Sequence, residues 1–135
     1  MTPRFEQLEH TADLALRIYG RDMRKLFANA AYAMFSQLAA VTRLGHTTER
    51  IVKAQGTDFE SLLVNWLNEL LYLHETEGEV YSAFSIDELS PESLAATVYG
   101  APCEEIYTII KAATYHDLRI SKTGEGFVAT IVFDV

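Results

Sequence analysis

The chain has 135 residues, of which 49% are hydrophobic and 22% charged, as expected for one globular domain with a buried core. Its net charge of -8 repels phosphate backbones and argues against direct, sequence-specific binding of nucleic acid. The single cysteine, Cys103, excludes an internal disulfide and a zinc site built from several thiolates. The N-terminus lacks a signal-peptide pattern, which with the cysteine count favours the cytoplasm. We expect a single domain over residues 1–135.

The first third of the chain contains two predicted strands and a predicted helix. Alternating apolar residues predict strands at 5–10 and 13–19, and apolar residues at helical spacing predict a helix over 23–39. A loop over 41–48 and a short strand over 51–54 follow. Four basic residues lie near the junction of the second strand and the helix, a pattern typical of a solvated face: Arg17, Arg21, Arg24 and Lys25.

A second helix is predicted over 57–77, with apolar residues at i, i+3, i+4 and i+7 and further apolar residues on its flanks. Such a helix must be covered on more than one side. Thr57 and Glu60 have the spacing of a capping box, and Gly78 is a plausible end. Four polar residues argue against a membrane span: Asn65, Asn68, Glu69 and Glu75.

The second half of the chain is rich in β-forming residues. Strands are expected in four runs: 80–89, 93–100, 106–120 and 126–133. The order of elements predicts an α+β domain with a mixed, largely antiparallel sheet and two helices packed on one face.

The end of the chain is unusually acidic for a predicted strand terminus. Asp134 lies beside the α-carboxylate of Val135, and these two anions repel each other unless a cation or hydrogen-bond donors compensate. Asp13, from another strand, would add a third oxygen donor. Such hard oxygen donors suit calcium, magnesium or manganese. The alternative is a frayed, solvated terminus.

A second polar stretch, over 111–117, lies inside the predicted strand at 106–120. Lys111 can neutralise a neighbouring carboxylate, and His116 can carry a proton. The simpler interpretation is that this stretch makes ordinary hydrogen bonds at the rim of the core. A catalytic group of His10, Asp13 and His116 is conceivable, but no serine or cysteine lies in a nucleophile motif, so we assign no catalytic residue.

Four stretches together resemble the archease family. They are HTAD at 10–13, DFESLLVNWLNELLYL at 58–73, KAATYHDL at 111–118 and FDV at 133–135, and they occur in the family's order over nearly the whole chain. The resemblance implies an accessory protein, not an enzyme, that activates an RtcB-type RNA ligase. Archeases promote guanylylation and multiple turnover of that ligase in tRNA splicing and RNA repair.

The resemblance also implies a divalent-metal site formed by Asp13, Asp134 and Val135, with calcium as the expected ion and magnesium or manganese as alternatives. We call the end of the domain that carries Asp13, Asp134 and Val135 the acidic tip. Four further residues in matching motifs are expected to support this tip or contact the partner: His10, Asp58, Lys111 and His116. Two other hypotheses stay open. One is a chaperone-like module that modulates an RNA-modifying enzyme such as a tRNA methyltransferase, and the other is a stand-alone metal-dependent hydrolase.

Overall fold

The computed structural model describes residues 3–8 and 13–135, and within them the strands form two antiparallel sheets. The larger sheet has the order β1-β2-β8-β6, with β7 also paired to β8. Its strands are β1 (Phe5–Leu8), β2 (Leu14–Gly20), β6 (Ala112–Ala113), β7 (Ile120–Thr123) and β8 (Gly126–Asp134). The smaller sheet has the order β3-β5-β4, with β3 (Thr48–Gln55), β4 (Glu79–Leu89) and β5 (Ser93–Pro102).

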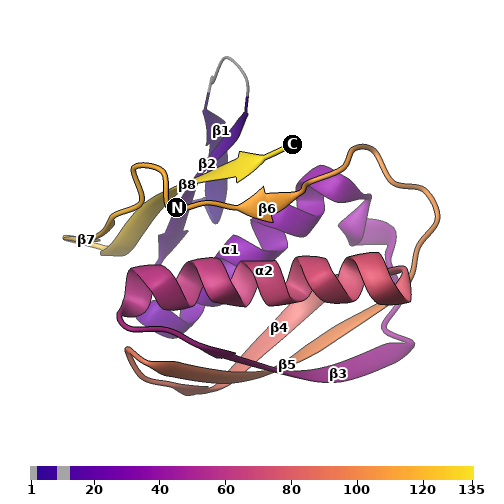
Figure 1. Ribbon diagram of the computed structural model, residues 1–135, viewed down its shortest axis with the longest axis horizontal. Helices are drawn as coiled ribbons and strands as arrows, with labels where there is room; N and C mark the ends of the chain where they lie inside the picture. The colour runs from indigo at the N-terminus through magenta and orange to yellow at the C-terminus, as the bar shows by residue number, and fades with distance from the viewer. Residues whose placement is uncertain (1–2, 9–12) are drawn as a thin grey trace.

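Two α-helices, α1 (Met23–Leu38) and α2 (Phe59–Glu77), lie between the two sheets, and a 3-10 turn, η1 (Val41–Arg43), follows α1 (Figure 1). The predicted α+β class is confirmed. The arrangement differs from one mixed sheet with both helices on one face, because every strand pair in the described residues is antiparallel and the sheets cover the helices from two sides.

Helix α2 has apolar residues on several sides because it contacts both sheets and α1. Leu63, Trp66 and Leu70 are all fully buried. The indole Nε1 of Trp66 donates a hydrogen bond to the carbonyl oxygen of Phe27 in α1 at 3.0 Å, which satisfies the one polar atom of this core side chain. No helix in the described ranges is long and apolar enough to cross a bilayer.

The ends of α2 are capped by its own sequence. Asp58 accepts a hydrogen bond from the Ser61 amide at 2.7 Å, and the Ser61 hydroxyl oxygen accepts one from the Asp58 amide at 3.1 Å. This is a capping box, one residue later than the predicted pair of Thr57 and Glu60. Gly78 ends the helix in the left-handed region with φ of 67°, as predicted.

The predicted strand over 106–120 is wrong for most of its length. Within this run only Ala112 and Ala113 of β6 and Ile120, the first residue of β7, pair with β8, and residues 103–111 carry the chain from the smaller sheet to the larger one. The Tyr107 amide in the middle of this segment donates to the carbonyl oxygen of Leu38 at the end of α1 instead of pairing with a strand. Asp117 then has a positive φ of 55° in a turn. The strand expected through 111–117 therefore ends at Ala113.

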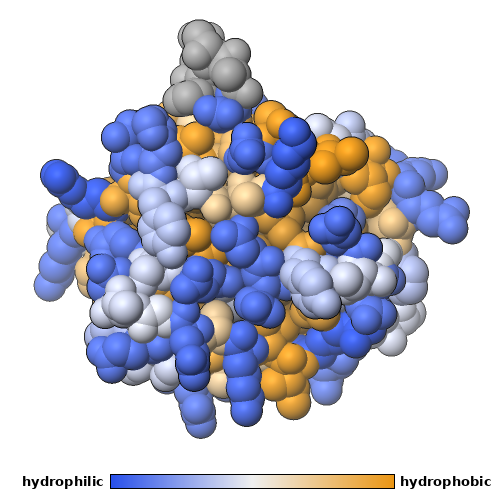
Figure 2. Space-filling view, viewed as in Figure 1, coloured by the Kyte–Doolittle hydropathy of each residue, from blue (hydrophilic) through white to orange (hydrophobic). Residues whose placement is uncertain are grey.

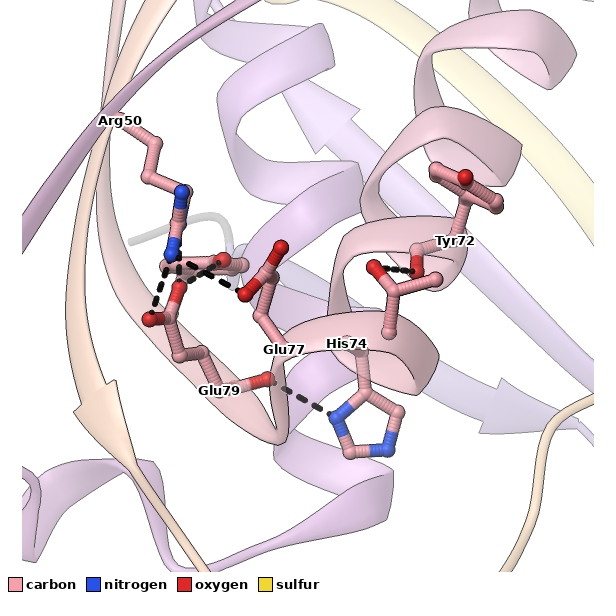
Figure 3. Close-up of polar contacts among 7 residues, drawn as sticks. Arg50, Tyr72, His74, Glu77 and Glu79 are labelled. Carbon is pink, nitrogen blue, oxygen red and sulfur yellow. Dashed lines mark hydrogen bonds and ion pairs between the residues drawn. The ribbon is translucent and has the colours of Figure 1, made fainter.

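A buried carboxylate fastens the end of α2 to the smaller sheet. Glu79, the first residue of β4, accepts hydrogen bonds at both of its oxygens from the guanidinium of Arg50 in β3. One of these oxygens also accepts from the Tyr81 hydroxyl at 2.6 Å, and the His74 ring hydrogen-bonds the Glu79 carbonyl (Figure 3). Hydrogen bonding from Arg50 lowers the pKa of Glu79, so this carboxylate is charged and fully paired.

Candidate functional site

The candidate site lies where β2 begins and β8 ends. In the antiparallel ladder of these strands, Leu14 pairs with Phe133. Asp13 directly precedes Leu14 and Asp134 directly follows Phe133, so continuation of the register places the two aspartates opposite each other. Residues opposite each other in an antiparallel pair have Cβ atoms about 4.5–5.5 Å apart and point to the same side. The pairing of β2 with β8 thus places an early and a late aspartate at the same end of one ladder.

Strand β6 holds the other side of the same end of β8. Ala112 pairs with Asp134, and the Lys111 amide donates to the Asp134 carbonyl oxygen at 2.7 Å. Continued by one residue, this register places Lys111 opposite Val135. Asp134 and Val135 are themselves exposed. The backbone at the end of β8 is therefore held from two sides, by β2 and by β6 (Figure 1).

Helix α2 supplies the support for β6. The Asn68 side chain donates to the Ala113 carbonyl oxygen and accepts from the Ala113 amide, at 3.2 and 2.8 Å. Thr114 adds two hydrogen bonds to the Val132 carbonyl oxygen in β8, from its amide and from its hydroxyl. Sequence reasoning used Asn68 only as an argument against a membrane span. An amide within an apolar helix was the available signal, because a buried amide must find partners.

The donor set at the tip fits a hard divalent cation. Asp13 and Asp134 contribute carboxylate oxygens, the ligands that calcium and magnesium prefer. Within residues 3–8 and 13–135, no three His, Cys, Asp or Glu side chains gather in a metal-binding arrangement. The metal site of Asp13, Asp134 and Val135 therefore stays a prediction.

The other predicted residues have varied positions. Asp58 acts as the N-cap of α2, which is a structural role. His116 lies in the turn after β6, exposed, with Nε2 3.3 Å from a carboxylate oxygen of Asp117. His10 falls outside the described residues, so the conceivable group of His10, Asp13 and His116 stays a prediction.

Comparison with known proteins finds relatives that match nearly the whole chain. The archease protein family (MTH1598/TM1083) matches residues 5–135. The protein archease of Methanosarcina mazei is 38% identical over 140 residues, covering 98% of this chain and 96% of its own length. That of Pyrococcus abyssi is 36% identical, covering 98% and 99%.

Solved structures agree with this result. The solution structure of Methanobacterium thermoautotrophicum protein 1598 has a TM-score of 0.80 and 31% identity, covering 98% of this chain and 99% of its own. A crystal structure of an archease from Thermotoga maritima, described as a possible chaperone, has a TM-score of 0.66 at 23% identity and supports the fold alone. The family resemblance predicted from the four motifs is confirmed, and the chain belongs to the archease family.

Proposed function

We propose that this archease is a cytoplasmic accessory protein that activates an RtcB-type RNA ligase, promoting its guanylylation and multiple turnover in tRNA splicing or RNA repair. It does so without catalysing ligation itself. The observation that supports this most is the placement of Asp13 opposite Asp134 at the end of the β2–β8 ladder. These two aspartates lie in two of the four stretches that resemble the family.

In this proposal the tip holds a divalent cation through Asp13, Asp134 and Val135, with calcium as the expected ion. A bound cation supplies positive charge that can neutralise triphosphate oxygens during nucleotidyl transfer. The chain's own residues position that charge. Lys111 and Ala112 fix the backbone of Asp134 from β6, and Asn68 fixes β6 from the core helix. The acidic groups are thereby presented on rigid strands.

The surroundings of the tip favour a protein partner. Among the described residues, six large hydrophobic side chains are strongly exposed, and four of them belong to the segment over 107–115 or to the chain end: Tyr107, Ile109, Tyr115 and Val135. In Figure 2, hydrophobic residues gather at the upper right, where Figure 1 places the segment from β5 to β6. Exposed apolar groups near a charged tip are typical of a docking surface.

The test is guanylylation of the cognate ligase in the presence of wild-type protein, Asp13→Asn or Asp134→Asn. Each substitution keeps the side-chain shape and removes one negative charge, and we expect each to abolish most of the stimulation. Asp87→Asn, in β4 of the smaller sheet, makes the same charge change and should leave stimulation intact. Undiminished stimulation by both tip variants would remove the proposed role of the aspartates.

A pull-down from cell extract tests the partner itself. The proposal predicts recovery of the ligase with wild-type protein. Recovery of an RNA methyltransferase without any ligase would favour the chaperone-like interaction module instead.

A further inference from the structure

A cavity of about 680 Å³ lies at the opposite end of the β2–β8 ladder from the two aspartates. Gly20 pairs with Phe127 at this end, six residues along β2 from Leu14. At roughly 3.3 Å per residue, the two ends are about 20 Å apart. The cavity is lined by β2, the first turns of α1, the β7–β8 turn and the segment before β1. Its volume lies within the range of about 300–1,000 Å³ typical of small-molecule sites.

Three basic side chains line this cavity although the protein has a net charge of -8: Arg4, Arg21 and Lys25. Among the described residues of the lining, Glu125 is the one acidic residue. Arg4 is held in place because its carbonyl oxygen accepts from the Tyr19 amide at 2.9 Å and its guanidinium lies 4.1 Å from the centre of the Tyr32 ring. Lys25 makes no ion pair within the described part of the chain.

The basic patch noticed in the sequence separates into two pairs in the structure. Arg17 binds Glu6 at 2.9 Å, and Arg24 donates to the carbonyl oxygens of Ile86 and Asp87. These two cations already have protein partners. Arg21 and Lys25 line the cavity, and the one ion pair of Arg21 within residues 3–8 and 13–135 is an exposed contact with Asp22 at 3.9 Å. Both side chains are exposed, as expected of a solvated face, and both also border the cavity.

The position of Lys25 on α1 adds a reason to expect an anion. The N-terminus of a helix carries a partial positive charge, which favours acidic neighbours and disfavours cations. The first turn of α1 contains no acidic residue, and Lys25 is its third residue. One Asp22 oxygen is used by the cap, where it accepts from the Lys25 amide at 2.8 Å. An anion in the cavity would compensate this excess of positive charge.

The inner wall of the cavity is suited to a ligand that carries a ring and polar groups in addition to phosphate. Asn29 is 6% exposed and lines the cavity; its Nδ2 donates to the Tyr19 carbonyl oxygen at 2.7 Å. Its Oδ1 accepts no hydrogen bond from the residues that the structure describes, so it can accept one from a ligand hydroxyl or amino group. Half-buried Phe127 and Val128 provide an apolar surface for a ring.

We infer that this cavity binds a small organic phosphate with a ring and hydroxyl groups, the chemistry of a nucleoside diphosphate. Its phosphates lie toward Arg21, Lys25 and the N-terminus of α1, and its ring packs on Phe127. The inference is independent of the function proposed for the acidic tip.

The test is isothermal titration calorimetry in a chelating buffer, so that no divalent cation at the tip contributes. The probes are ADP, inorganic pyrophosphate and adenosine. ADP should bind most tightly, because it combines charge and ring. Lys25→Gln and Arg21→Gln should each weaken the binding of ADP about tenfold, because each substitution removes one charge-assisted contact. Lys53→Gln on β3 is the matched control and should bind like the wild type, as should Asp134→Asn.

Nitrogen–proton NMR on the wild-type protein locates the ligand without any substitution. ADP should shift the amide signals of Gly20, Gly124 and Phe127 and leave those of Ala112 and Asp134 in place. Absence of ADP binding at millimolar concentration would overturn the inference. So would equal weakening by Lys53→Gln, or adenosine binding as tightly as ADP. Pyrophosphate binding as tightly as ADP would overturn the assignment of a ring-bearing ligand.

Discussion

The side chain of Asn68 and the backbone of Ala113 share two hydrogen bonds, one in each direction, at 3.2 and 2.8 Å. Asn68 lies in the buried helix α2, and Ala113 lies in the two-residue strand β6. Because β6 pairs with the last residues of β8, this amide adds a link between the core helix and the acidic tip. A strand of two residues is too short to hold itself in place by pairing alone.

Replacement of Asn68 by alanine should destabilise the protein by about 2 kcal/mol, because it leaves the buried amide and carbonyl of Ala113 without partners. Urea denaturation measures the effect. Asn65→Ala is the control, since Asn65 makes an exposed hydrogen bond to the Gln55 carbonyl oxygen, and its cost should stay below about 1 kcal/mol. Equal costs for the two variants would contradict the role given to Asn68.

Glu79→Gln should reduce the stability at neutral pH by about 1–2 kcal/mol, since a charged hydrogen-bond acceptor for Arg50 and Tyr81 becomes neutral. Hydrogen bonding from Arg50 lowers the pKa of Glu79 from its ordinary value of 4.5. The stabilisation is therefore fully present above that value and is lost as the pH falls through the lower, folded-state pKa.

Urea denaturation of Glu79→Gln and wild type over a series of pH values tests this expectation. The difference in free energy of unfolding should shrink below about pH 4. Glu77→Gln is the control, because Glu77 is a more exposed partner of Arg50 at 3.6 Å, and it should change stability little at any pH (Figure 3). A difference that stays constant from pH 7 to pH 3 would be inconsistent with the charged pair.

Gly20→Ala should destabilise the protein by about 2–3 kcal/mol, because a Cβ at this residue would lie 2.3 Å from the Leu26 amide nitrogen. That neighbour is helix backbone and cannot rotate away. At Gly45 the nearest atom to an added Cβ is 4.0 Å distant, so Gly45→Ala should be neutral or slightly stabilising. Thermal denaturation compares the two. A tolerated alanine at Gly20 would mean that β2 and α1 are less closely packed than described.

Calcium should change which of the two proteins, wild type or Asp134→Asn, has the higher melting temperature. In chelator, the substitution removes repulsion between opposed carboxylates, so the variant should melt at the same temperature as wild type or higher. With calcium at 100 times its Kd, wild type should gain about 2.7 kcal/mol and the variant much less. Asp87→Asn should respond to calcium as wild type does. A full calcium response in Asp134→Asn would argue against this ligand.

The core helix could be predicted closely from sequence because its signals are local. The end at Gly78 follows from one glycine that adopts a left-handed conformation. The capping box at the start of the helix lies one residue later than predicted, because two carboxylates and two hydroxyls there can each serve as a cap. Ser61 completes the box, and the carboxylate of Glu60 instead accepts from the Ile120 amide at 3.2 Å. That contact spans 60 residues and leaves no trace in the local pattern.

The division into two sheets and the path over 103–111 could not be predicted, because strand pairing is non-local. Ile109 and Ile110 have high β propensity, yet Ile109 is exposed and only Ile110 is buried. The pairing of β2 with β8 places Asp13 and Asp134 at the same end of one ladder, whereas metal binding there stays a prediction. The support from Asn68 was missed because its partner, Ala113, carries no chemical signal of its own.

Strand β8 runs from the cation-lined cavity to the acidic chain end, with β2 antiparallel beside it. These separated charges contribute an electric dipole along the axis of the two strands. In the field of a positively charged surface such a dipole experiences a torque, which turns the molecule before contact. An approaching archease would rotate until its carboxylates lead, so random collisions would be converted into oriented encounters, and added salt would slow them.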